Sequence, residues 1–226
     1  MSRPVVLTFV GHYLPGFKSG GPVQSIANTV ARLGDEFDFH IVTSDRDALA
    51  VAPYEGVKVD EWNTVGKASV FYTSPRGRSV GRLARLMRET PHDALYLNSL
   101  FDPVFTQRPL LARAMQWVPQ RPVLVAPRGE TSPGALQIKA WKKAPFLRIV
   151  PSLLYRGVTW LASSDYEARA IRLALGSGPS PVAAAPVFIA PDPPRHLPPT
   201  PPAPVRPPPP AAPATHIPPP PPPPHP

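Results

Sequence analysis

The uneven distribution of proline sets the strongest limit on what this chain can fold into. Of its 38 prolines, 24 lie between Pro179 and Pro226, and prolines are more than half of all residues from Pro191 onward. Because proline lacks a backbone donor and fixes φ near its polyproline II value, such a segment joins neither a helix nor an interior strand. We therefore expect one folded domain over residues 1–192 and a disordered, proline-rich tail over residues 193–226.

Before the tail, short apolar runs alternate with segments of helical periodicity. This alternation predicts an α/β fold with a Rossmann-like, doubly wound parallel sheet. The expected strands cover residues 5–10, 37–43, 68–72, 94–98, 123–127, 158–162 and 187–190. The expected helices cover residues 22–33, 79–89, 103–117, 133–143 and 164–175. The interval 48–66 contains proline and glycine breaks, and it is expected to be a long loop, with or without one edge strand.

The sequence contains no cysteine, which excludes disulfides, thiolate nucleophiles and cysteine metal sites. The first apolar run, residues 5–10, is too short for a signal peptide, and no run approaches the roughly 18 apolar residues that a membrane span needs. No spacing of His, Asp and Glu is typical of a metal site, and there is no G-x-S-x-G nucleophile. We therefore expect a cytoplasmic protein that uses no metal or other cofactor.

A formal charge of +9 favours acidic partners. The basic residues are scattered, with local clusters at residues 76–88 and 139–143, and they form no continuous stripe along the sequence. We therefore expect phosphorylated small molecules or an anionic membrane surface as partners, and no nucleic acid.

The loop after the first expected strand is a candidate binding segment. It ends in Gly20 and Gly21, directly before a helix that begins with Pro22. Glycines at such a strand-to-helix junction let backbone amides approach an anion beside the positive helix terminus, although the spacing is neither the dinucleotide nor the Walker A pattern. Gly20 and Gly21 are therefore expected to contact a phosphate or sugar diphosphate, with an ordinary turn as the alternative. His12, in the same loop, is a weaker acid–base candidate, and a hydrogen-bonded structural role explains it better.

A second candidate segment follows the strand at residues 123–127. Arg128 offers a fork of donors to phosphate or hydroxyl groups, and Glu130 can accept from hydroxyls or orient that arginine; a surface ion pair is the alternative. Lys139 follows on the next helix and is a further binding candidate. Asn98, at the end of its strand, is a weaker candidate that either binds a hydroxyl or closes a turn.

Two other acidic positions have structural explanations. Asp45, after the second strand, is placed where an acidic residue could meet a ribose, but a charged loop explains it equally well. Glu167 belongs to a capping-box pattern that begins at Ser164 and is explained as a helix cap.

Three segments together point to a known family. They read YLPGFKSGGPVQSI at residues 13–26, IVTSDRD at residues 41–47, and APRGE followed by SPGAL and Lys139 over residues 126–139. In this order, from about residue 5 to about residue 192, they resemble the N-terminal, acceptor-side domain of bacterial family-4 glycosyltransferases. These are retaining enzymes with the two-domain GT-B architecture.

The resemblance implies transfer of a sugar from a nucleotide sugar to a glycan or a lipid-linked acceptor at the inner membrane face, without a metal. It places Gly20 and Gly21 against the phosphates of the nucleotide sugar. Many relatives carry a histidine near the position of Arg128 that assists at the reacting sugar; here Arg128 or Glu130 is expected to act in binding alone. The family holds most of the nucleotide sugar in a second domain that this sequence does not show, so we expect little transfer from this chain by itself.

Two other functions remain open from the sequence. In the first alternative, the chain is a non-catalytic acceptor-binding domain or one chain of a split glycosyltransferase. In the second, it is an interaction protein whose proline-rich tail docks in aromatic grooves as a polyproline helix.

Overall fold

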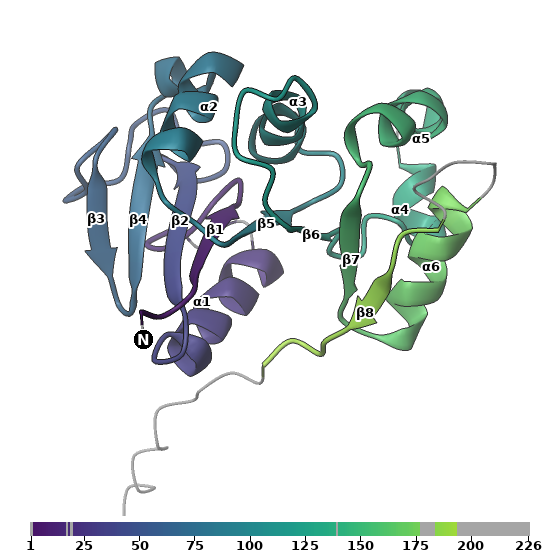
Figure 1. Cartoon of the computed structure of the whole chain (residues 1–226), viewed down its shortest axis with the longest axis horizontal. Coiled ribbons are helices and arrows are strands. Elements are labelled where there is room, and N and C mark those ends of the chain that lie inside the picture. Colours follow the sequence, from purple (N-terminus) through teal and green to yellow (C-terminus); the bar gives the residue numbers. More distant parts are fainter. Residues whose placement is uncertain (1, 17, 19, 139, 177–183, 194–226) are drawn as a thin grey trace, which may run out of the picture. The chain divides into compact units, whose positions relative to one another are not determined.

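A computed structural model of the chain describes residues 2–16, 18, 20–138, 140–176 and 184–193. Within this part, eight strands form one sheet in the order β3-β4-β2-β1-β5-β6-β7-β8 (Figure 1). The strands are β1 Val5–Phe9, β2 Asp38–Ser44, β3 Trp62–Val65, β4 Ala68–Thr73, β5 Ala94–Asn98, β6 Val123–Ala126, β7 Val158–Ala162 and β8 Val187–Ile189. The expected tail lies outside the described residues from Pro194 onward.

All neighbouring strands pair in parallel except β3 and β4, which are antiparallel. The doubly wound α/β fold expected from the sequence is therefore confirmed. The interval 48–66 contains the edge strand β3, which begins at Trp62. Because the other strands are parallel, the loops that follow them gather at one edge of the sheet, where open α/β sheets bind ligands.

Three of the five expected helices are confirmed to within one residue at each end, and the helices expected over residues 103–117 and 133–143 differ in extent. The helices are α1 Gly21–Leu33, α2 Val80–Glu89, α3 Arg108–Ala114, α4 Pro133–Gln137, α5 Ala140–Leu154 and α6 Asp165–Leu175. A 3-10 turn, Pro75–Arg78, precedes α2, and a π-helical turn, Pro103–Gln107, precedes α3. The helix expected over residues 103–117 is thus this turn followed by the shorter α3.

The helix expected over residues 133–143 was wrong in both its continuity and its end. An extended residue, Ile138, ends α4, and α5 then continues to Leu154 with Pro145 and Pro151 inside it. Each internal proline lacks the N–H for one helical hydrogen bond, so the local sequence argues against a helix that continues through them. The packing of Phe146, with its neighbours on α5, against the main core accounts for the helix persisting there.

The two faces of the sheet are covered unequally. On one face α1 packs Val23, Ile26 and Val30 against β2 and β4. The larger core on the other face takes residues from α2, α3, α5 and α6. Beside α1, the first face carries an apolar groove of about 370 Å³ over β5, β6 and β7, whose lining includes Leu124 and Leu161. Among the described residues, no helix is long and apolar enough to cross a bilayer.

Candidate functional site at the carboxyl ends of the strands

The loops that follow β1, β5, β6 and β7 contact one another. A Cβ atom on Gly11, after β1, would lie 3.1 Å from the carboxylate of Asp102, which follows β5. The loop after β6 is tied to the β5 loop through Glu130, and Gly129 ties it to Glu167 in the first turn of α6, the helix after β7. Apart from Lys139, which lies outside the described residues, the sequence-predicted site residues belong to this edge or to the helix that begins there.

Arg128 lies at the centre of this edge in a left-handed conformation, with φ of 55°. Its Nε and Nη2 donate to Oδ1 of Asn98 at 3.0 and 2.9 Å, and Nη2 also donates to the hydroxyl of Tyr96 at 2.7 Å. Its Nη1 donates to Ser25 Oγ at 2.9 Å and to Asp192 Oδ1 at 2.7 Å. All five donors of the guanidinium group therefore have acceptors within the chain.

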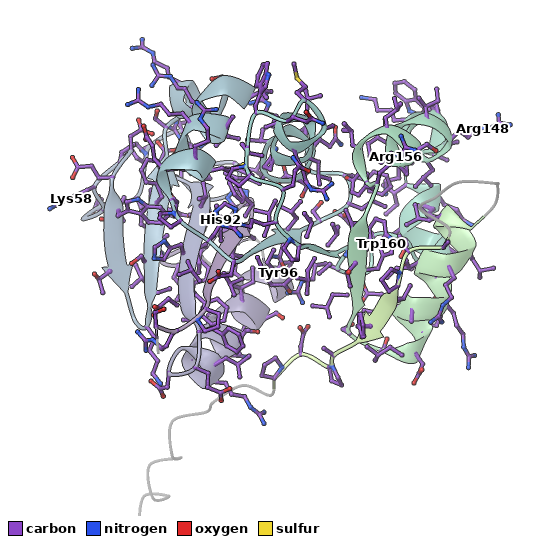
Figure 2. All side chains as sticks on the ribbon, viewed as in Figure 1. Lys58, His92, Tyr96, Arg148, Arg156 and Trp160 are labelled. Atoms are coloured by element: carbon purple, nitrogen blue, oxygen red, sulfur yellow. The ribbon has the colours of Figure 1, made fainter. Side chains whose placement is uncertain are left out.

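The exposures within this cluster are unequal. The side chain of Arg128 is 12% exposed, whereas that of Asp192 is 47% exposed. Tyr96, which belongs to β5, lies near the middle of the sheet (Figure 2), and its hydroxyl accepts from Nη2 of Arg128. Asp192 is the most accessible of the four acceptor side chains, so it is the partner that an incoming anion could replace on Arg128.

Glu130 does not orient Arg128, because its carboxylate points to the loop after β5. It accepts from Ser99 Oγ at 2.9 Å and from the backbone amides of Leu100 and Phe101 at 2.5 and 3.2 Å. Burial raises the pKa of Glu130 above its ordinary value, while these three donors act in the opposite direction. Asn98 takes the orienting role that the sequence interpretation allowed for Glu130.

The residue that Glu130 holds is itself strained. Ser99 has φ of 115°, a value that residues with a side chain rarely adopt. Its Oγ bonds to Glu130, and its carbonyl oxygen accepts from Thr106 Oγ1 at 3.0 Å. The backbone is strained at both Ser99 and Arg128, and several hydrogen bonds fix each residue. Such strain is typical of active sites and ligand-binding sites.

Glu167 makes contacts outside its own helix, which the helix-cap explanation did not include. The α6 cap is Ser164, whose Oγ accepts from the Glu167 amide at 3.2 Å. The buried carboxylate of Glu167 accepts from Gly129 N at 2.6 Å and from the amide and hydroxyl of Ser163 at 2.8 and 2.7 Å. It therefore fixes the backbone directly after Arg128, which the sequence interpretation did not foresee.

The glycines at positions 16, 20 and 21 differ in what requires them. A Cβ atom on Gly16 would lie 2.1 Å from the Tyr54 hydroxyl, so packing requires glycine there. Gly20 has φ of 62°, which itself favours glycine. Gly21 has neither constraint, and no heavy atom lies within 4 Å of the Cβ position at Gly20 or Gly21. The α1 N-terminus has no side-chain cap, so the Gly21 amide has no helical partner and lies beside this open space.

The remaining candidates have structural partners. Nδ1 of His12 lies 3.1 Å from the carbonyl oxygen of Arg46, which supports the structural explanation of that histidine. Asp45 is buried and pairs with Arg46 and Arg78, both at 2.9 Å, so its carboxylate holds the loops after β2 and β4 together. Burial lowers the pKa of Arg78, although Asp45 opposes the shift.

Sequence reasoning missed Ser25, Tyr96 and Asp192. Tyr96 could have been found, because residues two apart on a strand share a face and Asn98 was already a candidate. Ser25 and Asp192 are 103 and 64 residues from Arg128 in sequence, and no local pattern connects them.

The described residues contain no group of three or more His, Asp and Glu side chains placed to bind a metal. The sequence matches no protein-family model and no curated protein.

Proposed function

We propose that this domain is the acceptor-side half of a glycosyltransferase that moves a sugar from a nucleotide sugar to a glycan or lipid-linked acceptor. The proposal combines the family resemblance of three sequence segments with the place of two of them in the fold. Those two segments, which carry Gly20 and Arg128, meet at α1, because Arg128 is hydrogen-bonded to Ser25 in the second turn of that helix.

The observation that carries the proposal is the uncapped N-terminus of α1 beside an arginine. Ser25 lies four residues beyond Gly21, about 6 Å along the helix axis. The free amide of Gly21 and the positive end of the helix would bind one phosphate of the nucleotide sugar. Arg128 would bind the neighbouring phosphate after exchanging Asp192 for it.

In this proposal Glu130 and Glu167 are positioning residues. Both carboxylates already accept three hydrogen bonds from protein donors, and these hold the loops on either side of Arg128. Neither carboxylate is arranged to take a proton from an acceptor hydroxyl. Together with the family's use of a second domain for the donor, this leads us to expect binding without efficient transfer from the chain alone.

A lipid-linked acceptor would bring the domain to the cytoplasmic face of a membrane. The formal charge of +9 favours approach to an anionic lipid surface. We therefore place the protein in the cytoplasm, with peripheral contact to the inner membrane face.

The test is nucleotide binding followed by transfer. Isothermal titration of the full chain with UDP, GDP and ADP should give binding to at least one nucleotide, and Arg128→Gln should weaken it about tenfold, the loss expected for charge-assisted hydrogen bonds. Incubation with radiolabelled nucleotide sugars and membrane lipid extract should give little product. Absence of nucleotide binding, or binding that Arg128→Gln leaves intact, would contradict the proposed site; robust multiple-turnover transfer would contradict the assignment of half an active site.

A further inference from the structure

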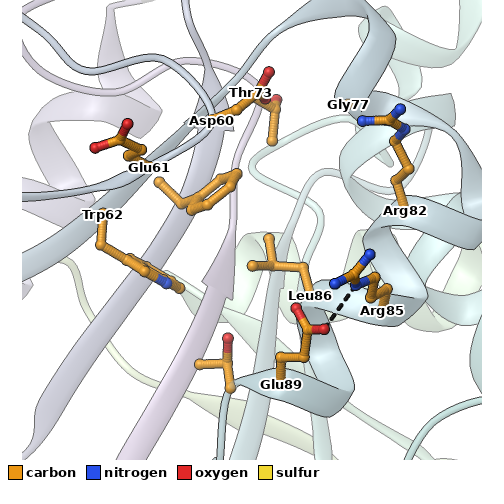
Figure 3. Close-up of a pocket in the computed structure, with 11 residues that line it drawn as sticks. Asp60, Glu61, Trp62, Thr73, Gly77, Arg82, Arg85, Leu86 and Glu89 are labelled. Carbon is orange, nitrogen blue, oxygen red and sulfur yellow. Dashed lines mark hydrogen bonds and ion pairs between the residues drawn. The ribbon is translucent and has the colours of Figure 1, made fainter.

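A second pocket lies beside the edge strand β3, between this strand and α2. It is a cavity of about 730 Å³ lined by Trp62, Phe71, Leu86, Arg82, Arg85 and Glu89, among other residues. Figure 3 shows Trp62 on the strand side and the arginines on the helix side, with Leu86 between them. The strand β4 is four positions from β6 in the sheet, about 19 Å at the usual strand spacing, so the pocket is separate from the Arg128 site.

The aromatic wall of the pocket is held in place from behind. The Trp62 ring lies 5.3 Å from the Phe71 ring in an edge-to-face contact and 5.1 Å from the His40 ring. The loop before Trp62 is closed by Asn63, which accepts from the Lys58 amide at 2.9 Å and donates to the Lys58 carbonyl oxygen at 2.8 Å. A half-buried indole fixed in this way offers a preformed flat surface at little entropic cost.

The helix side supplies hydrogen-bonding groups. Arg85 and Glu89 form an exposed i,i+4 pair at 2.7 Å, so a donor and an acceptor stand side by side. Arg82, one turn earlier on the same face of α2, has no acidic partner among the residues that the structure describes. Leu86 lies between Arg82 and Glu89 in the lining, which gives this wall an apolar centre and a polar rim (Figure 3).

The charges around the pocket restrict the ligand. The lining contains three carboxylates, of Asp60, Glu61 and Glu89, against two guanidinium groups. Asp60 is partly committed, since it accepts from the Ser74 amide at 2.9 Å. A rim with more acidic than basic groups repels a polyanion such as a nucleoside diphosphate, but carboxylates and guanidinium groups together suit a ligand with many hydroxyls.

We propose that this pocket binds an uncharged pyranose unit, with the apolar C–H face of the sugar ring packed on Trp62 and its hydroxyls bonded to Arg82 and to the Arg85–Glu89 pair. The role of that sugar as part of the acceptor glycan rests on the proposed function. The binding itself does not, because none of the residues that line the pocket belongs to α1 or is a hydrogen-bond partner of Arg128. This division makes the two proposals separately testable.

The experiment is a titration of the full chain with maltotriose and cellotriose, followed by heteronuclear NMR of the tryptophan indole groups and by calorimetry. One of the two neutral sugars should shift the Trp62 indole resonance. The affinity obtained from this shift should be higher for that sugar than for tri-galacturonate or UDP. Arg82→Gln should weaken binding about fivefold and Trp62→Ala at least about tenfold. The matched controls, Arg88→Gln and Trp141→Ala, change an arginine of α2 and an exposed tryptophan outside the pocket lining, and they should leave the affinity unchanged.

Arg82 is exposed, so its substitution leaves the core intact and keeps the test decisive if Trp62→Ala unfolds the edge. Sugar binding that Arg82→Gln does not weaken, no shift of the Trp62 resonance with either neutral sugar, or tighter binding of tri-galacturonate or UDP there would each overturn the pocket assignment. Arg128→Gln should leave sugar affinity unchanged, and Arg82→Gln should leave nucleotide affinity unchanged. Failure of nucleotide binding with intact sugar binding would therefore remove the proposed transferase function but not the sugar pocket.

Discussion

Arg128 and Asp192 form an ion pair in which the arginine is enclosed and the aspartate is accessible. The Arg128 guanidinium group is therefore fixed in place for an anionic ligand, and in the absence of a ligand the Asp192 carboxylate neutralises its charge. The pair also bonds to one hydroxyl, because Ser25 Oγ accepts from Arg128 and donates to the same Asp192 oxygen. A ligand phosphate in place of Asp192 would find both donors already in position.

Substituting Asp192→Asn should therefore tighten the binding of inorganic pyrophosphate about fivefold, because it removes the competing negative charge and weakens the hold on Arg128. The measurement is isothermal titration at low ionic strength, where charge effects are least screened. Asp35→Asn is the matched control, since Asp35 belongs to an exposed pair with Lys67 on another part of the surface. An affinity that is unchanged by Asp192→Asn would contradict the exchange of Asp192 for a phosphate.

Glu130 makes the free energy of unfolding depend on pH. Its pKa in the folded chain is raised above the ordinary value of 4.5, chiefly by burial, so the folded state keeps the proton to a higher pH than the unfolded chain does. The stabilising contribution is fully present below pH 4.5 and is lost as the pH rises through the folded-state pKa. Urea unfolding across this window should show that Glu130→Gln removes that part of the decline, and an unaltered pH slope in the variant would show that Glu130 is not its source.

At the scale of elements, α1 has a terminus that two adjacent glycines leave uncapped. Gly21→Ala places a methyl group in open space within a helix, so the free energy of unfolding should stay the same or rise by up to about 1 kcal/mol. Gly20→Ala should lower it by about 1 kcal/mol, because alanine is strained at φ of 62°. Chemical denaturation measures both changes.

The same pair of variants separates stability from binding. If the α1 amides take a phosphate, the added methyl group of Gly21→Ala occupies part of that space, and pyrophosphate affinity should fall although stability does not. A Gly21→Ala protein with the original affinity would show that the anion does not approach this helix terminus.

The elements also show why the sequence predicted the strands of the sheet better than the extents of the helices. Central parallel strands such as β1 and β6 carry mostly apolar side chains on both faces, so they read as nearly continuous apolar runs. The length of α5 had no such signal, because Pro145 and Pro151 argue locally against a helix that tertiary packing stabilises. The candidate site followed the same division: strand ends located Arg128, whereas its contacts to Ser25 and Asp192 depend on how distant segments pack.

Across the whole domain, the two faces of the sheet differ in how well they are covered. Four helices contribute to the core on one face, and α1 is the helix that packs on the other within the described residues. Leu97 of β5 is fully buried in the larger core, whereas Leu124 of β6 lines the apolar groove beside α1 and is half-buried. The two leucines lie on neighbouring parallel strands and so form a matched pair.

Leu97→Ala should lower the free energy of unfolding by about 3 kcal/mol, since it leaves a cavity among close-packed side chains. Leu124→Ala should lower it by about 1 kcal/mol, because its side chain already faces open space and leaves no enclosed void. Denaturant unfolding at several protein concentrations measures both values. Equal losses for the two variants, or a loss at Leu124 that grows with protein concentration, would mean that the groove is covered in solution, in the second case by another copy of the chain.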